Sequence, residues 1–436
     1  MTDTDVAPAV PARPPKAPSR SRRRAWSVTA LLVVFMMINF ADKSVLGLAA
    51  DPIREDLGLS ASAFGLANSA FFLLFSLCGA AVGLLADRVR PKWLLLTMAV
   101  LWSVSQAPLA LGGGLAALIA SRIVLGAAEG PAFPVAQQAT LSWFPNHRRN
   151  LPGALIVMGT TFGVVLAAPA VTWLVEHHGW RSAFAAVAVV GVLWAALWVV
   201  LGAEGPYAAD PAAASPDVPA TGTAPRRVPY RRILGTRTWI GSTAAYFSSY
   251  WVAAFVLVWL PSYLQEGLGY SSASSARLLV LVWGLTAAVI LGQAALTGWL
   301  MRRGATSRWA RGRVGGILLL VAASACLALP SAPSGTATVL LLVTGFGFAG
   351  AMVSVAVTTV TEMAPAERRG GALGFMNAVV TTAGLIAPVL VGHLVDLHGP
   401  SGYDQAVLIT GALLLMGGIA AVTLIDPRRD GHLLSL

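Results

Sequence analysis

The chain has 436 residues, of which 56% are hydrophobic and only 11% are charged, whereas charged residues make up about 25% of a typical soluble domain. This balance excludes a water-soluble globular protein, because too little charge is present to cover a surface that faces water. The formal net charge of +11 could suggest a nucleic-acid partner. The basic residues lie in short segments between apolar runs, however, so we expect no nucleic-acid binding and interpret the charge as a sign of membrane topology. Cys78 and Cys326 lie in separate apolar segments, and we expect no disulfide, no metal site and no cofactor.

Twelve apolar runs are long enough to cross a bilayer, since about 20 helical residues span its hydrocarbon core. In chain order they lie near residues 25–48, 63–86, 92–111, 115–142, 151–175, 181–201, 238–264, 274–300, 314–330, 336–362, 370–395 and 404–425. The first run follows three arginines, as the apolar part of a signal peptide would, but it is longer than such a segment and contains Asp42 and Lys43. We therefore expect a retained first helix and an all-α membrane protein with twelve transmembrane helices.

Lysine and arginine are distributed unevenly between the two sides of this predicted bundle. With a cytoplasmic amino terminus, 25 of the 30 lie in cytoplasmic tails and loops, and only Arg54, Arg181 and Arg277 lie outside. Cytoplasmic segments of membrane proteins carry such an excess. We expect a multi-pass protein of the inner (plasma) membrane with both termini in the cytoplasm.

One long polar segment divides the chain into halves. We expect a disordered cytoplasmic tail at residues 1–24, a six-helix bundle at 25–202, a cytoplasmic linker at 203–235, a second six-helix bundle at 236–426 and a cytoplasmic tail at 427–436. The halves echo each other, because a Pro-x-x-Arg-Arg sequence followed by Gly-Ala-Leu occurs at 145–155 and again at 365–373. Such echoes at corresponding positions predict an internal duplication and two pseudo-symmetric bundles.

The loop after the second predicted helix reads Gly-Leu-Leu-Ala-Asp-Arg over residues 83–88. The excess of positive charge in cytoplasmic loops accounts for Arg88 but not for this order of residues. The segment resembles the Gly-x-Leu-Ala-Asp-Arg loop of the major facilitator superfamily, although Arg90 replaces a usual glycine. The resemblance implies the major facilitator fold and a gating loop that contains Gly83, Asp87 and Arg88.

Longer segments resemble one branch of that superfamily, the anion:cation symporter family. They are Asn39-Phe-Ala-Asp-Lys43, the Arg-x-x-Leu-Gly-x-x-Glu-Gly-Pro-x-Phe-Pro segment at 122–134, Trp-Leu-Pro-Ser-Tyr-Leu at 259–264, and Gly-Phe-x-Asn at 374–377. The resemblance runs from about residue 39 to about residue 400. It implies a transporter of organic anions such as sugar acids, mostly coupled to protons, and it implies substrate contacts by Asn39 and Lys43.

Four ionisable residues lie well inside predicted helices, namely Asp42, Lys43, Arg122 and Glu129. An unpaired charge at this depth costs at least roughly 2.5–3.5 kcal/mol, so we expect the pairs Asp42–Arg122 and Lys43–Glu129. One interpretation is purely structural, with two ion pairs that fasten the first helix to the fourth. The alternative is functional: protonation of Glu129 releases Lys43 to hold a substrate carboxylate, with Asp42 as the rival protonation site and Arg122 as a further substrate contact.

Polar residues on other helices are weaker candidates for lining a substrate site. They are Gln137, Tyr246, Ser249, Tyr250 and Asn377, and for each of them hydrogen bonding between helices is an equally good interpretation. Phe40, Phe75 and Gly79 stand where the family usually has tyrosine, tyrosine and glutamine. We expect from these replacements a substrate with fewer hydroxyl groups than a sugar acid.

Three classes of function compete. The quartet of charges and the family segments favour proton-coupled symport of a small carboxylate by alternating access. An antiporter or exporter of phosphate esters or drugs on the same fold is the alternative. We expect neither an enzyme nor a sensor, because no buried nucleophile, metal cluster or large partner-binding domain is evident. The expected partners are a small organic anion, protons and membrane lipid, and we expect a monomer.

Overall fold

The computed structural model describes residues 19–85, 89–144, 150–206, 228–365 and 368–435. Its described residues form helices joined by short turns, without strands. The first half contains α1 (Ser19–Leu48), α2 (Ala50–Leu57), α3 (Ala61–Leu85), α4 (Pro91–Ala110), α5 (Leu115–Glu129), α6 (Ala132–Leu141), α7 (Asn150–His178) and α8 (Trp180–Leu201). The second half contains α9 (Tyr230–Leu234), α10 (Arg237–Val258), α11 (Leu260–Ser262), α12 (Ser272–Arg302), α13 (Val314–Ala328), α14 (Thr336–Phe348), α15 (Met352–Met363), α16 (Arg369–His398), α17 (Ser401–Leu424) and α18 (Pro427–Ser435).

Twelve helical stretches among the described residues are long and apolar enough to cross a membrane, which confirms the predicted fold class. Three of them are composite. They combine α5 with α6, α13 with the π-turn at 308–313 that precedes it, and α14 with α15. The ends of the other stretches agree with the predicted runs to within a few residues, except that the seventh predicted run, 238–264, continues past the end of α10 at Val258 into α11. Local differences occur as well. Helix α1 begins at Ser19 inside the predicted tail, α2 forms between the first two predicted runs, α9 forms inside the predicted linker and α18 forms inside the predicted carboxyl-terminal tail. The domain boundaries themselves stay predictions.

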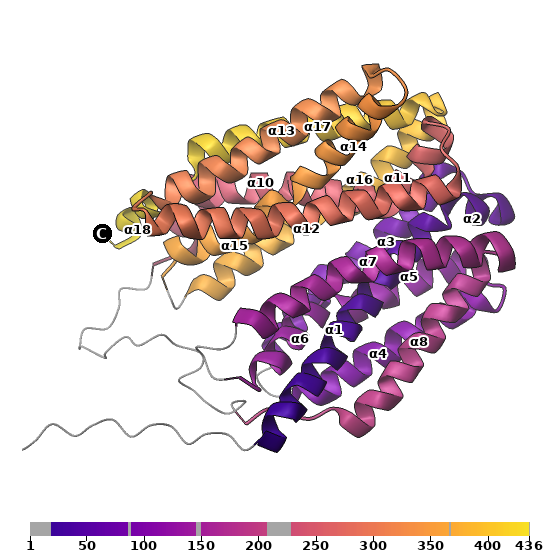
Figure 1. Cartoon of the computed structure of the whole chain (residues 1–436), viewed down its shortest axis with the longest axis horizontal. Coiled ribbons are helices and arrows are strands. Elements are labelled where there is room, and N and C mark those ends of the chain that lie inside the picture. Colours follow the sequence, from indigo (N-terminus) through magenta and orange to yellow (C-terminus); the bar gives the residue numbers. More distant parts are fainter. Residues whose placement is uncertain (1–18, 86–88, 145–149, 207–227, 366–367, 436) are drawn as a thin grey trace, which may run out of the picture.

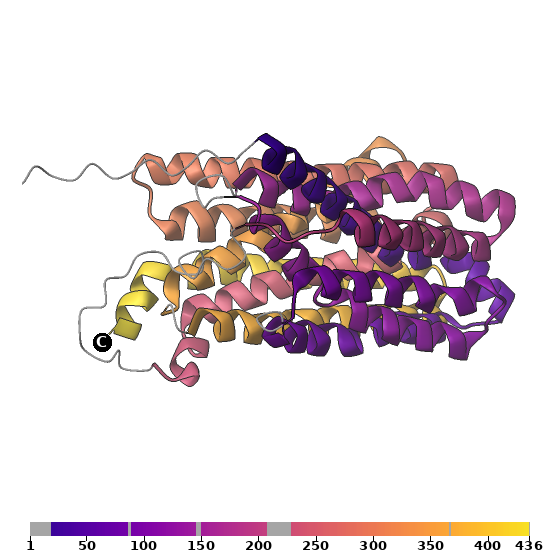
Figure 2. The same cartoon turned by 90° about the horizontal axis from the view of Figure 1, so that it is seen from below.

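The helices run roughly side by side along the long axis and form two bundles, one from each half of the chain (Figure 1). Helix α1 begins, and α18 lies, toward one end of the molecule (Figures 1 and 2). We call this end the terminal end and the opposite end, where α2 and α11 lie, the distal end. The two bundles converge at the distal end and their ribbons diverge toward the terminal end (Figure 1).

Glycines allow the backbones of the two bundles to meet along α3 and α16. A methyl group on Gly65 would overlap the carbonyl oxygen of Pro388, and one on Gly392 would overlap that of Ala61. Small residues permit helices to approach this closely in membranes. At the distal end of the same seam, the Asp396 carboxylate accepts hydrogen bonds from the backbone N–H groups of Ala61 and Ser62, each at 2.8 Å. A carboxylate of one bundle therefore caps a helix that belongs to the other.

A second polar contact joins the bundles between α2 and the turn after α11. Arg54 forms an ion pair with Glu266 at 3.0 Å, and the Ser262 hydroxyl donates a hydrogen bond to Asp51 at 2.8 Å. Tyr403 also donates to Glu266, at 2.7 Å. Burial, with a smaller contribution from the negative charge of Glu266, raises the pKa of Asp51 from 3.8 to about 6, and the nearby Arg54 acts in the opposite direction.

This raised pKa predicts that contact at the distal end depends on pH. The joined arrangement binds a proton on Asp51 more tightly than separated bundles would, so acidification through pH 6 favours the joined arrangement. Between pH 7.5 and 5.5 we expect a shift of about fourfold in the ratio of joined to separated molecules. Distances between spin labels at positions 111 and 334, in exposed distal turns of the two bundles, measure that ratio.

Asp51→Asn should remove most of this pH response. Asp56→Asn is the matched control, because Asp56 also lies in α2 but pairs at 2.6 Å with Arg181 of its own bundle. An unchanged response in Asp51→Asn, or an equal loss in Asp56→Asn, would contradict the assignment.

Candidate transport site

The fourth membrane-crossing stretch is interrupted beside its carboxylate. Helix α5 ends at Glu129 and α6 begins at Ala132, with Gly130 and Pro131 between them. Proline has no N–H group, so Pro131 and Pro134 cannot continue the helical hydrogen bonds at this point. The interruption in the sequence Glu-Gly-Pro therefore places Glu129 at a helix end inside the bundle.

Two glycines bring α5 against α3. A methyl group on Gly126 would overlap the carbonyl oxygen of Phe71, and one on Gly130 would overlap that of Phe75. The side chains of Phe71 and Phe75 are thereby held next to the end of α5. Gly79, the next turn of α3, packs against the backbone of Gly130, so in this structure its lack of a side chain serves helix packing.

Lys43 of α1 pairs with Glu129, as we expected. Its ammonium lies 3.2 Å from the Glu129 carboxylate, and the Glu129 side chain is fully buried while that of Lys43 is 13% exposed. The ammonium also donates a hydrogen bond of 2.9 Å to the side-chain carbonyl of Asn39, one helical turn earlier. These three residues from the predicted site therefore form one connected group.

Aromatic rings surround the same ammonium. It lies 4.3 Å from the ring centre of Phe40, 5.3 Å from that of Phe75 and 5.9 Å from that of Phe71. Rings at these distances attract a cation by about 0.5–2 kcal/mol, more when water is excluded. The surroundings of Lys43 thus combine one carboxylate and one amide oxygen with apolar faces.

The expected ion pair between Asp42 and Arg122 is absent among the described contacts, and that prediction was wrong. Asp42 instead accepts a hydrogen bond of 2.6 Å from the amide of Gln106 on α4, and both side chains are buried. Arg122 is only 2% exposed, yet its Nε and one terminal nitrogen make no hydrogen bond with a described residue. Its guanidinium lies 6.0 Å from the ring centre of Phe71, within electrostatic range of both Asp42 and Glu129.

The expectation that each buried charge pairs with an opposite charge failed for Asp42, because α4 supplies a neutral partner. Gln106 lies on α4 and meets Asp42 only after α1 and α4 pack together. The sequence signal was available, since an amide in the middle of an apolar run is costly unless it is bonded. Our prediction considered only ionisable residues at this depth.

The other predicted lining residues are divided between the two bundles. Tyr250 of α10 faces the first bundle, because its ring lies 6.1 Å from that of Phe72 on α3. The ring of Tyr246, one turn earlier on α10, lies 6.3 Å from that of Tyr250. Ser249 is buried and its hydroxyl has no described partner. Gln137 is half-buried next to Gly153 of α7, and Asn377 lies on an exposed face of α16. No described contact joins Gln137 or Asn377 to the Lys43–Glu129 pair.

The predicted gating loop falls mostly outside the described residues. Gly83 lies in the last turn of α3, whereas Asp87 and Arg88 are not described. Within the described part of the chain, no group of three or more His, Cys, Asp or Glu side chains is arranged to hold a metal ion.

A bundle of membrane-crossing helices with a buried ion pair between two of them is typical of helical membrane transporters. The family model of the Major Facilitator Superfamily matches residues 32–361 and 307–435 of this chain. The chain belongs to that superfamily, and it is a secondary transporter rather than an enzyme.

Similar proteins are transporters of organic acids. The chain is 27% identical to the hexuronate transporter of Bacillus subtilis (strain 168) over 403 residues, which cover 91% of this chain and 94% of that one. It is 28% identical to a probable sulfoacetate transporter of Cupriavidus necator over 407 residues, with 91% and 92% covered. The D-galactonate transporter of Escherichia coli O6:H1 is 26% identical over 436 residues, with 94% and 97% covered. These relatives confirm the resemblance to organic-anion transporters of the superfamily.

Solved structures agree with the fold. The crystal structure of a bacterial homologue of the lysosomal transporter Spinster has a TM-score of 0.75 at 18% identity and covers 93% of this chain and 98% of its own. The crystal structure of a D-xylose–proton symporter has a TM-score of 0.71 at 16% identity, with 93% and 99% covered. At these identities the likeness concerns the fold alone.

The close approach of α3 and α5 predicts that Gly126 tolerates no side chain. Gly126→Ala should lower the melting temperature by several degrees, because the added methyl group must push the Phe71 backbone aside. Gly292→Ala is the matched control, since nothing lies within 4 Å of a methyl group there and alanine favours a helix by about 0.5–1 kcal/mol over glycine. Thermal unfolding in detergent compares the two, and equal melting temperatures would contradict the packing argument.

Proposed function

We propose that this protein is a symporter that carries a small organic carboxylate together with a proton. The observation that carries the proposal is the ion pair between Lys43 and Glu129, which is buried among aromatic rings where a charge without a partner is costly. Lys43 can exchange one carboxylate, that of Glu129, for another, that of the substrate. Glu129 then becomes the proton site.

The coupling follows from charge balance. When a substrate carboxylate takes the ammonium of Lys43, Glu129 loses its partner in a medium of low dielectric constant, where the neutral acid is the less costly form. Binding of the anion and of the proton therefore favour each other, and by linkage each strengthens the other by the same factor. Arg122, with nitrogens that make no described hydrogen bond, is a second cation for the same anion, and Asp42, bonded to neutral Gln106, is the rival proton site.

The rings around Lys43 support a substrate with few hydroxyl groups. Phe40 and Phe75 line the ammonium and offer no hydrogen bond to a sugar hydroxyl. Among the similar proteins are transporters named for hexuronate and galactonate, which are sugar acids, and one named for sulfoacetate, which is a short acid. For this chain we infer a short aliphatic or an aromatic acid, with Asn39, Ser249 and Tyr250 as polar contacts. Gln137, Tyr246 and Asn377 stay weaker candidates.

The orientation in the membrane rests on the distribution of basic residues. With 25 of the 30 lysines and arginines on one side, we infer that the terminal end faces the cytoplasm of the inner membrane. In that orientation the contacts at the distal end support a state closed to the outside, as one state of an alternating-access cycle. Labelling of a cysteine at position 215 from outside intact cells would contradict this orientation. We further infer that the transporter works as a monomer.

An antiporter or exporter of phosphate esters or drugs is the alternative. Phosphate esters carry two negative charges near neutral pH and favour two buried bases, one from each bundle. Arg122 is the one fully buried basic side chain among the described residues, and no lysine or arginine of the described second half is buried. This asymmetry favours a substrate with a single carboxylate.

Uptake by the purified protein in proteoliposomes tests the function. With an imposed pH gradient, acid outside, we expect accumulation of a labelled short aliphatic or aromatic acid. Unlabelled acids of that kind should compete better than hexonates or hexarates. Competition dominated by sugar acids would show that the inferred substrate class is wrong, and accumulation without any pH gradient would show that proton symport is wrong.

Lys43 provides the first prediction on mechanism. Lys43→Ala should abolish substrate binding, because Lys43 is the one cation among the described residues that forms an ion pair with Glu129, whereas Lys43→Arg should retain partial transport since the charge remains. Lys92→Ala is the control, because that lysine, at the start of α4, donates its hydrogen bond to the backbone carbonyl of Val199 on α8. Binding is measured by isothermal titration on variants whose melting temperatures show that they are folded. Full transport by Lys43→Ala would remove Lys43 from the site.

Glu129 provides the second prediction on mechanism. Glu129→Gln keeps the shape of the protonated side chain and cannot release a proton, so it should still exchange substrate in counterflow but fail to accumulate substrate when a pH difference is imposed. Asp42→Asn is the comparison, because it removes the rival carboxylate and retains a bond to Gln106. If Glu129→Gln accumulates substrate and Asp42→Asn does not, the coupling role belongs to Asp42.

A further inference from the structure

A pocket of about 570 Å³ lies at the terminal end of the second bundle, remote in the chain from the residues around Lys43. It is formed where the chain turns from α9 into α10 and where α18 packs beside them. Its lining residues are Arg231, Arg232, Gly235, Thr236, Arg237, Arg429, Asp430, Leu433 and Leu434. Four arginines and one aspartate therefore share this pocket.

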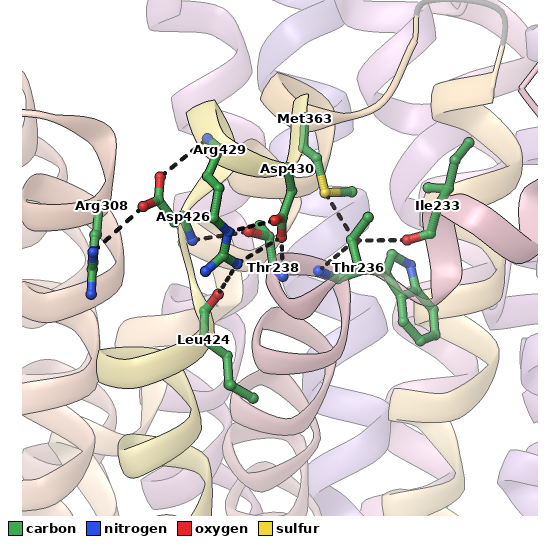
Figure 3. Close-up of polar contacts among 10 residues, drawn as sticks. Ile233, Thr236, Thr238, Arg308, Met363, Leu424, Asp426, Arg429 and Asp430 are labelled. Carbon is green, nitrogen blue, oxygen red and sulfur yellow. Dashed lines mark hydrogen bonds and ion pairs between the residues drawn. The ribbon is translucent and has the colours of Figure 1, made fainter. Parts of the chain in front are cut away.

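The aspartate is already neutralised within the protein. Asp430 is 2% exposed and accepts hydrogen bonds from Arg429 at 2.7 Å and from the backbone N–H of Thr238 at 2.7 Å (Figure 3). Burial by itself would raise the pKa of the Asp430 carboxyl, but these bonds hold that pKa below its ordinary value. The same contacts fasten α18 to the first turn of α10, which fixes the wall of the pocket.

The remaining three arginines have no such partner. Arg231, Arg232 and Arg237 are exposed, and their side chains make no hydrogen bond or ion pair with any residue in the described ranges. Elsewhere at this end, by contrast, Arg311 pairs with Glu362 and Arg308 with Asp426. Three positive charges around one pocket, without a described counter-charge, favour an anion with several oxygen acceptors.

An apolar surface adjoins these charges. Leu433 of α18 lines the pocket and is 58% exposed, and α10 begins to cross the membrane at Arg237. From this start of the α10 span we expect the pocket at the level where the polar headgroups of a bilayer meet its acyl chains. Basic pockets between helices at this depth suit anionic lipid headgroups, and a free anion in water would make no use of the leucine.

We propose that this pocket binds the phosphate-bearing headgroup of an anionic phospholipid, with Arg231, Arg232 and Arg237 on the phosphate and Leu433 against an acyl chain. The lipid would bridge α9 and α10 to α18, and so would brace the second bundle at its terminal end. The inference goes beyond transport of a carboxylate and holds whichever side of the membrane the terminal end faces.

Native mass spectrometry of the full chain, titrated with dioleoylphosphatidylglycerol, tests the proposal. The triple variant Arg231→Gln, Arg232→Gln, Arg237→Gln should bind the tightest lipid at least about tenfold more weakly than the unaltered chain. The matched control removes three charges from the same end outside the pocket, at Arg302, Arg303 and Arg313, and should bind as the unaltered chain does. Equal weakening in both variants, or none in the pocket variant, would overturn the proposal.

Two further measurements complete the test. One distinguishes a lipid headgroup from a free anion in the pocket, and the other checks that the variants are folded. Inorganic phosphate at the same concentration should not displace the lipid; if it does, the pocket binds a free anion and the lipid assignment is overturned. Both triple variants should melt as the unaltered chain does in nanodiscs of phosphatidylcholine alone. Should the pocket variant be unstable there, Arg232→Gln by itself should weaken lipid binding by about fivefold, and unchanged binding would again overturn the proposal.

Discussion

The cost of a charge in the middle of a membrane is the constraint on which this structure depends. Within the first bundle, Asp42, Lys43, Arg122 and Glu129 are the charged residues placed at depth, and each must be offset by a neighbour. Lys43 and Glu129 offset each other directly, and Asn39 and three phenylalanine rings complete the surroundings of the ammonium. The helix interruption at Gly130 and the glycine contacts between α3 and α5 both place side chains around this one pair.

The two bundles contribute unequally to the site. The charges of the proposed site belong to the first bundle, whereas in the proposal α10 of the second supplies hydroxyl groups and rings, of which Tyr250 meets Phe72 across the interface. A substrate held between them would be bound by charge from one side and by shape and hydrogen bonds from the other. Such a division suits alternating access, because the second bundle can move relative to the first without breaking an ion pair at the centre.

The contacts that join the two bundles at the distal end can also break and allow the bundles to separate. The seam of α3 and α16 is made by backbones in close approach and by a carboxylate that caps a neighbouring helix, and the second contact is a small group around Arg54 and Glu266. These polar groups lie at the distal end, where water can replace their hydrogen bonds once the bundles separate. Burial raises the pKa of Asp51 to about 6, and we therefore expect the same contact to respond to protons independently of the Lys43–Glu129 pair.

Three features followed from the amino-acid sequence alone, namely the class of fold, the number of membrane-crossing helices and the pairing of Lys43 with Glu129. Apolar runs of about 20 residues have one stable outcome in a bilayer, and a buried base needs an acid within reach. The bond of Asp42 to Gln106 rather than to Arg122 required the packed fold, because the choice depends on which face α4 turns toward α1. In the same way, the arginines near 231–237 are a mere excess of charge in the sequence. They line a pocket only after α18, far along the chain, has packed against the start of α10.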